Sequence, residues 1–215
     1  MRSVVTILNY GRSNLLSVRR ALEACGALVN FAGTPDAVRD AGALVLPGVG
    51  AFADGMAQLR ALGLVEPIRE KEANGTPLLG ICLGMQMLFQ HSPEGGETEG
   101  LGLVEGEAAP LPAAAVDGTS LKVPHIGWSA LRLTPSAQSG PLRALAGVAV
   151  PEVYFVHSYR VLPASAADWA ASIDWGGHSV CAAVQRGSVT GLQFHPEKSG
   201  PVGLAILQEF VASLG

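Results

Sequence analysis

The chain of 215 residues has few charged side chains and no long hydrophobic run. Asp, Glu, Lys and Arg make up 15% of the sequence, whereas about 25% is usual for soluble domains. The net charge of -4 and the lack of a basic stripe give no reason to expect nucleic acid as a partner. No stretch reaches the roughly 18 apolar residues of a membrane span. We therefore expect a globular protein whose sparsely charged surface is partly covered by another protein.

Cysteine is also scarce. Cys25, Cys82 and Cys181 lie far apart and form no C-x-x-C pair, which argues against a disulfide framework and a structural zinc site. The first ten residues turn polar too quickly for a signal peptide, so they predict a first strand instead. We expect free thiols, no metal and a cytoplasmic location, with Cys25 and Cys181 as buried structural thiols.

The first ninety residues alternate short apolar strands with helical patterns. Strands without polar alternation are typical of parallel sheets that helices cover on both faces. The pattern predicts an α/β fold, with a doubly wound, mixed, mostly parallel sheet and flanking helices. The predicted strands are Ser3–Leu8, Leu28–Phe31, Ala43–Leu46 and Pro77–Ile81, and the helices are Asn14–Cys25 with Asn14 as cap, a short one from Thr34, Phe52–Leu62 and Val65–Ala73.

After His91 the pattern changes to shorter strands with short connections, which favours antiparallel pairing. We expect residues 1–215 to form one domain, because no linker is long or polar enough to separate two. The predicted strands are Leu121–Leu133, Glu152–Val161, Trp169–Ile173, Ser179–Gln185 and Val189–Phe194, the predicted loops and linkers are Ser92–Gly100, Ala108–Ala115 and Thr134–Pro141, and the last helix is Pro201–Leu214.

A single thiol stands where a strand meets a helix. Cys82 lies between the strand Pro77–Ile81 and a helical pattern over Leu83–Gln90, flanked by Gly80 and Gly84. This arrangement is typical of a nucleophile elbow, in which small neighbours let the backbone come close. The N-terminus of the following helix favours a thiolate. A buried cysteine in a Leu-rich segment is the alternative, and position alone does not decide between the two.

A base and an acid follow the last predicted strand. His195 and Glu197 are two residues apart, so in extended backbone, which Pro196 allows, their side chains share a face. Together with Cys82 they could form a Cys-His-Glu triad. The alternative is a solvated pair at a strand end.

A glycine-rich turn, Pro47-Gly48-Val49-Gly50, follows another apolar strand. Its backbone could turn an N–H toward an oxyanion, with the amide of Leu83 as the second donor. Taken alone the turn has no functional meaning. The elbow, this turn and the His-Glu pair all fall where parallel strands would end, which favours one site.

These motifs together resemble the class I (triad-type) glutamine amidotransferases, whose signature is matched by Gly80–Gln86 and His195–Glu197. Other segments make the chain similar to the glutaminase subunits of imidazole glycerol phosphate synthases. Two departures are Arg12-Ser13, in a loop that would face the partner, and the loop Ala108–Ala115. The further segments are NYG at Asn9–Gly11, PGVGAF at Pro47–Phe52, KVPHIGW at Lys122–Trp128, YFVHSY at Tyr154–Tyr159 and QFHPEKSG at Gln193–Gly200.

The resemblance implies that Cys82 attacks the side-chain amide of glutamine while His195, oriented by Glu197, moves the proton. It implies no cofactor. The oxyanion hole would be formed by the amides of Val49 and Leu83. The residues that would hold glutamine are Gly50, Gln86, Ser158 and Tyr159.

The resemblance also implies a heterodimer with a cyclase, a (β/α)₈ barrel. The ammonia would pass to this partner, which makes imidazole glycerol phosphate and AICAR in histidine biosynthesis. Ile126 and Trp128 alternate along one predicted strand, so they can share a face, although a Trp there is ordinarily part of a core. They would lie at the interface with Asn14 and Lys198.

Three other functions remain open on the residues alone. The glutaminase subunit for pyridoxal phosphate synthesis would share the triad but lack KVPHIGW and YFVHSY. A non-catalytic regulatory homologue would keep the fold with a degraded site. A cysteine peptidase would use the same chemistry on a peptide bond.

Overall fold

The computed structural model of the protein describes residues 2–11 and 14–215. The sequence departure at Arg12-Ser13 lies outside these residues. The first half of the chain alternates strands and helices, as predicted. Its elements are β1 (Val4–Leu8), α1 (Leu15–Ala24), β2 (Leu28–Ala32), α2 (Pro35–Arg39), β3 (Leu44–Gly48), α3 (Phe52–Ala61), α4 (Val65–Ala73), β4 (Leu78–Cys82) and α5 (Leu83–Met87).

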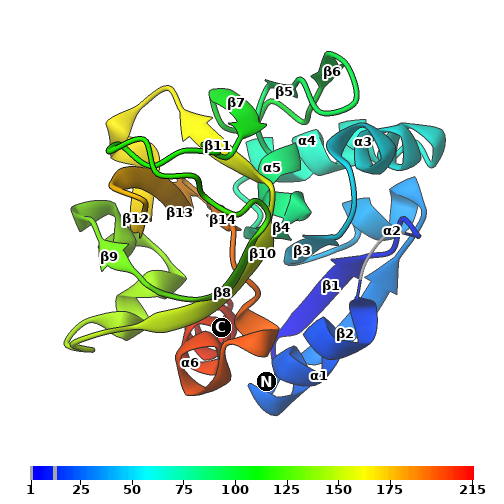
Figure 1. Cartoon of the computed structure of the whole chain (residues 1–215). Coiled ribbons are helices and arrows are strands. Elements are labelled where there is room, and N and C mark those ends of the chain that lie inside the picture. The colour runs from blue at the N-terminus through cyan, green and yellow to red at the C-terminus, as the bar shows by residue number, and fades with distance from the viewer. Residues whose placement is uncertain (1, 12–13) are drawn as a thin grey trace.

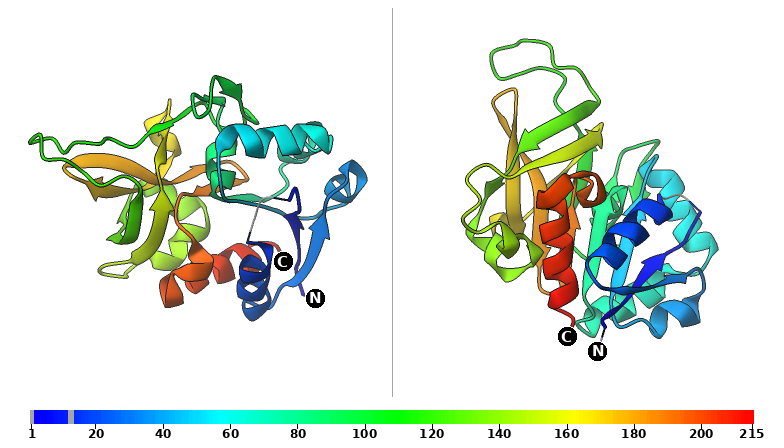
Figure 2. Two further views of the ribbon diagram at one scale, coloured as in Figure 1. Left: turned by 45° about the vertical axis from the view of Figure 1, so that its right-hand side comes forward. Right: turned by 90° about the horizontal axis from the view of Figure 1, so that it is seen from below.

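Five parallel strands form the centre of the molecule, in the order β2-β1-β3-β4-β14, where β14 is Val189–Leu192. Helices cover both faces (Figures 1 and 2): α1 and α6 (Gly200–Ala212) lie on one face, and α3, α4 and α5 on the other. Every residue of β3 and β4 is buried. This burial on both faces explains why these strands read as continuous apolar runs.

Strands that pair antiparallel, except for β5 beside β7, extend the sheet beyond β14. In the part of the chain that the structure describes, the sheet has 12 strands. The first partner of β14 is β13, followed by β11 and β7, while β12 pairs with β13 and β9. The fold prediction is therefore confirmed in both halves. These strands are β5 (His91–Ser92), β6 (Thr98–Glu99), β7 (Gly106–Pro110), β9 (Arg132–Leu133), β11 (Tyr159–Pro163), β12 (Trp169–Trp175) and β13 (His178–Arg186).

A separate two-stranded sheet lies beside the site, formed by β8 (His125–Ala130) and β10 (Glu152–His157). The prediction of one strand over Glu152–Val161 was wrong, because the chain turns at Ser158 and enters the main sheet as β11. The strand predicted over Leu121–Leu133 begins only at His125 and is broken at Leu131, since β8 ends at Ala130 and β9 belongs to the main sheet. Pro124 precedes His125 and has no N–H for a ladder.

Other corrections concern connections. The linker predicted at Ala108–Ala115 begins inside β7, because β11 supplies backbone partners for Ala108 and Pro110. The predicted linker Thr134–Pro141 contains 3-10 turns.

Cys25 is half-buried rather than buried, whereas Cys181 is buried as expected. No helix among the described residues is long and apolar enough to cross a membrane. The 3-10 turns of the chain are η1 (Pro135–Ser139), η2 (Pro141–Leu145), η3 (Ala166–Asp168) and η4 (Pro196–Lys198).

Candidate active site

Cys82 ends β4 in a strained conformation, with φ 55 and ψ -114. Among the described residues it is the only one besides glycines with a positive φ. The neighbouring glycines permit the turn: a Cβ on Gly84 would lie 1.7 Å from the Leu46 carbonyl oxygen. This geometry is that of a nucleophile elbow. The helix after Cys82 is shorter than predicted, ending at Met87 rather than Gln90, so its dipole is weak.

His195 and Glu197 lie next to Cys82 because β14 is the parallel neighbour of β4. The Nδ1 atom of His195 is 2.8 Å from Oε1 of Glu197, and the side chain of Glu197 is fully buried. The prediction of extended backbone between them was wrong, because Pro196–Lys198 forms the 3-10 turn η4. The turn still directs both side chains toward each other.

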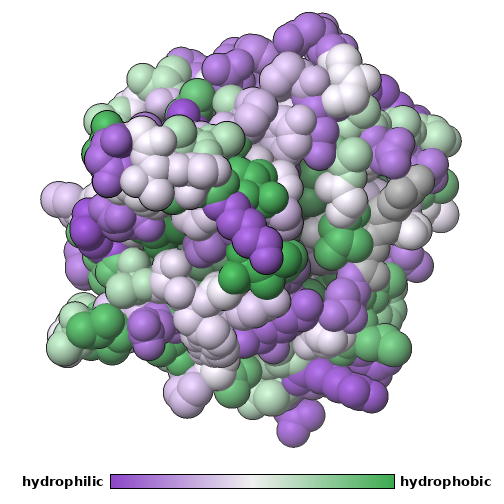
Figure 3. All heavy atoms as spheres, in the orientation of Figure 1, coloured by the Kyte–Doolittle hydropathy of each residue, from purple (hydrophilic) through white to green (hydrophobic). Residues whose placement is uncertain are grey.

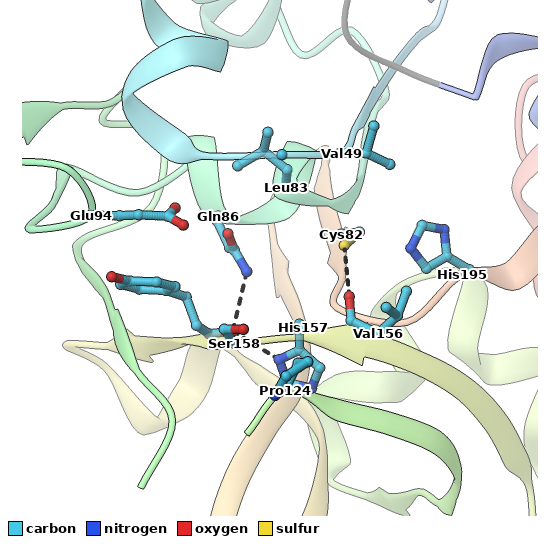
Figure 4. A pocket seen from close by; sticks show the side chains of 12 residues that line it. Val49, Cys82, Leu83, Gln86, Glu94, Pro124, Val156, His157, Ser158 and His195 are labelled. Atoms are coloured by element: carbon cyan, nitrogen blue, oxygen red, sulfur yellow. Dashed lines mark hydrogen bonds between the residues drawn. The ribbon is translucent and has the colours of Figure 1, made fainter. Parts of the chain in front are cut away.

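The electrostatic setting of His195 favours the imidazolium. Burial lowers the pKa of His195, but hydrogen bonds to Cys82 and Glu197 together with their negative charges outweigh this and raise it to about 9. The Nε2 atom is buried without a partner at hydrogen-bond geometry and faces the sulfur (Figure 4). The pair is therefore arranged to exchange a proton.

A cavity of about 310 Å³ opens in front of Cys82, which is at the small end of ligand pockets. It is lined by each of the residues predicted to hold glutamine or an oxyanion. Figure 4 shows Gln86 and His195 on opposite sides of the Cys82 sulfur. Sequence reasoning missed four of the lining residues. Those predicted are Val49, Gly50, Leu83, Gln86, Ser158 and Tyr159, and those missed are Glu94, Pro124, Val156 and His157.

Glu94 is the missed residue with the most obvious chemistry. Its Oε2 accepts a hydrogen bond of 2.8 Å from the Phe52 amide at the start of α3. Burial raises the pKa of Glu94, against the lowering by that amide. The sequence shows it only as one of three acids in the loop Ser92–Gly100, and nothing in that loop distinguishes it from Glu97 and Glu99.

The turn Pro47–Gly50 lies at the same edge, since Gly48 pairs with Cys82 in the sheet. The buried Tyr10 hydroxyl donates to the Pro47 carbonyl over 2.7 Å and so holds the start of the turn. Gly50 has a φ of +99, a conformation that favours glycine. Val49, which lies between Gly48 and Gly50, is 43% exposed.

The residues predicted at an interface are exposed. Ile126 is 61% and Trp128 55% exposed, so the core position that is usual for Trp does not apply. The Lys198 ammonium lies 5.9 Å from the centre of the Tyr154 ring, which also contacts Trp128. Asn14 is exposed at the N-cap position of α1, but its side chain makes no capping hydrogen bond. Hydrophobic residues gather near the middle of this face, over β8 and β10 (Figure 3).

No group of three His, Cys, Asp or Glu side chains in the described ranges is arranged to hold a metal. The strained cysteine, its His-Glu pair and the mostly parallel sheet define a class of cysteine-dependent hydrolases. The model of the family "Glutamine amidotransferase class-I" matches residues 6–214. The chain belongs to this family.

Three curated proteins are similar to this chain over 97% of its length. The chain is 45% identical to "Imidazole glycerol phosphate synthase subunit HisH 1" of Legionella pneumophila (strain Lens), over 97% of this chain and 99% of that one. It is 46% identical to the HisH subunit of Geobacillus thermodenitrificans over 97% and 95%. With "Imidazole glycerol phosphate synthase hisHF, chloroplastic" of Arabidopsis thaliana it shares 42% over 97% of this chain but 34% of that protein.

Solved structures agree in fold. "Structure of PurLQS from Thermotoga maritima" superposes with a TM-score of 0.78 and 21% identity over the full length of both chains. A "Crystal structure of glutamine amidotransferase" gives a TM-score of 0.73 at 18% identity, covering 99% of this chain and 98% of that one.

Proposed function

We propose that this chain hydrolyses glutamine to glutamate and ammonia, as the glutaminase subunit of an imidazole glycerol phosphate synthase. The observation that carries the proposal is the strained Cys82 facing an imidazole that a buried carboxylate orients, at a cavity of amino-acid size. The names of the relatives at 45% and 46% identity support the assignment to this synthase.

The reaction begins when the Cys82 sulfur attacks the side-chain carbonyl carbon of glutamine. His195 holds the thiol proton at Nε2 and delivers it to the departing nitrogen, which leaves as ammonia. Glu197 orients the imidazole. Water then gives a proton to His195 and attacks the thioester, which releases glutamate and restores the thiolate. The amides of Leu83 and Val49 stabilise the oxyanion in both steps.

The charged end of glutamine would be held at the opposite side of the cavity. Gln86 uses its amide nitrogen for the protein, because Nε2 lies 3.1 Å from both the Tyr159 carbonyl and Oε1 of Gln193. Only its carbonyl oxygen remains for the substrate. That oxygen and the Glu94 carboxylate suit the α-ammonium group, while Gly50 and Ser158 complete the wall.

The ammonia would pass to a cyclase (β/α)₈ barrel that makes imidazole glycerol phosphate and AICAR. We propose a heterodimer in the cytoplasm, in which residues 1–215 form one domain. The exposed Ile126 and Trp128 support a docking face around β8, with Asn14 and Lys198 at its edge.

The test is co-purification with a candidate cyclase barrel, followed by a glutaminase assay with and without the cyclase ligand. We expect glutamate production that rises when cyclase and ligand are added, and none from Cys82→Ala. Cys25→Ser is the matched control, because this thiol is outside the cavity. Equal activity of Cys82→Ala would indicate a non-catalytic homologue, and cleavage of peptides instead of glutamine would indicate a peptidase.

A further inference from the structure

Two glutamine side chains connect the wall of the cavity with the nucleophile. Gln193 has no exposed surface and Gln86 is 5% exposed. Gln86 Nε2 lies 3.1 Å from the Tyr159 carbonyl oxygen and 3.1 Å from Oε1 of Gln193. The Nε2 atom of Gln193 in turn lies 3.9 Å from the Cys82 sulfur. The proposed mechanism gives Gln193 no role.

The Tyr159 carbonyl fixes how both amides point. A backbone carbonyl only accepts hydrogen bonds, so Gln86 must present its nitrogen to it. The second hydrogen of that nitrogen then points to Gln193, which must accept through its oxygen. The nitrogen of Gln193 is therefore directed at Cys82. One main-chain atom thus determines that the sulfur faces a donor.

A hydrogen-bond donor beside the Cys82 sulfur favours the thiolate over the thiol. The Cys82 sulfur also lies 3.9 Å from the Val156 carbonyl oxygen, which can accept from a thiol but repels a thiolate. A hydrogen bond to a charged acceptor is roughly twice as strong as one to a neutral acceptor, so the Gln193 N–H stabilises the thiolate more than the thiol. The helix after Cys82 has five residues and contributes little dipole.

We propose that Gln193 is a further catalytic residue, which donates an N–H to the Cys82 thiolate, and that Gln86 is the positioning residue that orients it. The proposal rests on the function proposed above for the same cysteine. It adds a third group to the sulfur's environment besides His195 and the oxyanion donors. It also gives Gln86 a task that does not depend on glutamine being bound.

The chain offers a matched control in a second buried glutamine. Gln185 is 7% exposed and lies on β13. Its amide donates to the Gly187 carbonyl and accepts from the Thr190 hydroxyl. Substituting Gln185 or Gln193 by Met removes one buried amide of the same size in each case, but only Gln193 contacts the sulfur.

The experiment measures the rate of Cys82 alkylation by iodoacetamide against pH, in a Cys25→Ser background. It needs neither glutamine nor cyclase. In Gln193→Met we expect the midpoint of the profile to move up by about one pH unit, as the thiolate loses its donor. Gln193→Glu, which puts a carboxylate beside the sulfur, should move it further. Gln86→Met should give a smaller upward shift, and Gln185→Met none.

The outcomes separate this proposal from the proposed function. An unchanged midpoint in both Gln193 variants, with folding verified by circular dichroism, overturns the donor role. The same shift in Gln185→Met also overturns it, because the effect would then come from lost packing. A shift confined to the Gln193 and Gln86 variants supports the donor role even if wild-type protein with cyclase releases no glutamate, a result that would refute only the proposed glutaminase activity.

Discussion

At the scale of single residues, the backbone of Cys82 is the feature on which the site depends. Its φ of 55 costs an L-residue on the order of 1–3 kcal/mol, so the surroundings must hold it in place. Glycines on both sides allow this, because the helix after the elbow packs directly on β3. The glycine spacing was readable in the sequence. The approach of Gln193 was not, because it lies 111 residues away along the chain.

Gly84→Ala should destabilise the protein by about 3 kcal/mol, the upper range for overpacking. The new Cβ would lie 1.7 Å from the Leu46 carbonyl oxygen, a main-chain atom that cannot rotate away. Urea unfolding followed by circular dichroism measures the change. Gly42→Ala is the control, since a Cβ there meets nothing within 4 Å. Equal stability of the two variants would contradict the close packing at the elbow.

His195 should stabilise the fold most at low to neutral pH. Its pKa in the folded protein, about 9, is above the ordinary 6.5, since the hydrogen bonds to Cys82 and Glu197 outweigh burial. The contribution is therefore complete below about pH 6.5 and is lost as the pH rises through 9. We expect the free energy of unfolding of wild type to fall toward that of His195→Asn between pH 6.5 and 9.5. A constant difference over this range would refute the raised pKa.

At the scale of secondary-structure elements, the corner between β10 and β11 shapes the cavity. Burial lowers the pKa of His157 and keeps its ring neutral. Its Nδ1 donates to the Tyr159 carbonyl over 2.8 Å, so its Nε2 accepts from His125 Nδ1 over 3.1 Å. His125 Nε2 is left to accept from the Ser129 hydroxyl at 3.1 Å. Both rings are thus neutral in this arrangement. Through these hydrogen bonds β8 and β10, which carry the proposed docking face, connect to the Tyr159 carbonyl that also holds Gln86.

The protein should lose stability in weak acid because of this corner. Burial lowers the pKa of His157 to about 4 from 6.5, so the unfolded chain binds a proton that the folded chain does not. The contribution is present above pH 6.5 and is lost as the pH falls to 4, on the order of 3 kcal/mol. Urea unfolding at several pH values should give wild type a steeper loss than His157→Asn. Parallel curves would contradict a neutral, buried His157.

The two halves of the sheet differed in how well the sequence predicted them. The parallel strands were found because burial on both faces makes apolar runs such as Leu44–Leu46. The strands β5 and β6 have two residues each and owe their pairing to distant neighbours, so no local pattern indicates them. The break at Ser158 was missed because Glu152–Val161 keeps a strand-like pattern throughout. The sequence predicted those site residues that belong to recognisable motifs. It did not single out Glu94 and Gln193, because the residues that they contact are distant along the chain.

At the scale of the whole molecule, the exposed apolar face around β8 predicts where the partner binds. Trp128→Arg should weaken cyclase binding by about 2 kcal/mol, or roughly 30-fold in Kd. Glutamine hydrolysis by the isolated chain should be unaffected, since Trp128 is outside the cavity. Isothermal titration calorimetry with the cyclase measures the change. Leu62→Arg, at the far end of α3 from the cavity and 38% exposed, is the control, and equal binding by both variants would exclude this face.

The sheet order has a consequence for how the protein folds. The strand β4, which ends at Cys82, and the strand β14, which precedes His195, are neighbours in the sheet, yet most of the chain's second half separates them in sequence. Pairing between such distant segments is slow to form, because a long loop must close before any contact rewards it. Until β14 docks, the edge of β4 is open to other chains. Recovery of glutamine hydrolysis during refolding would therefore report the docking of β14, later than the appearance of helices.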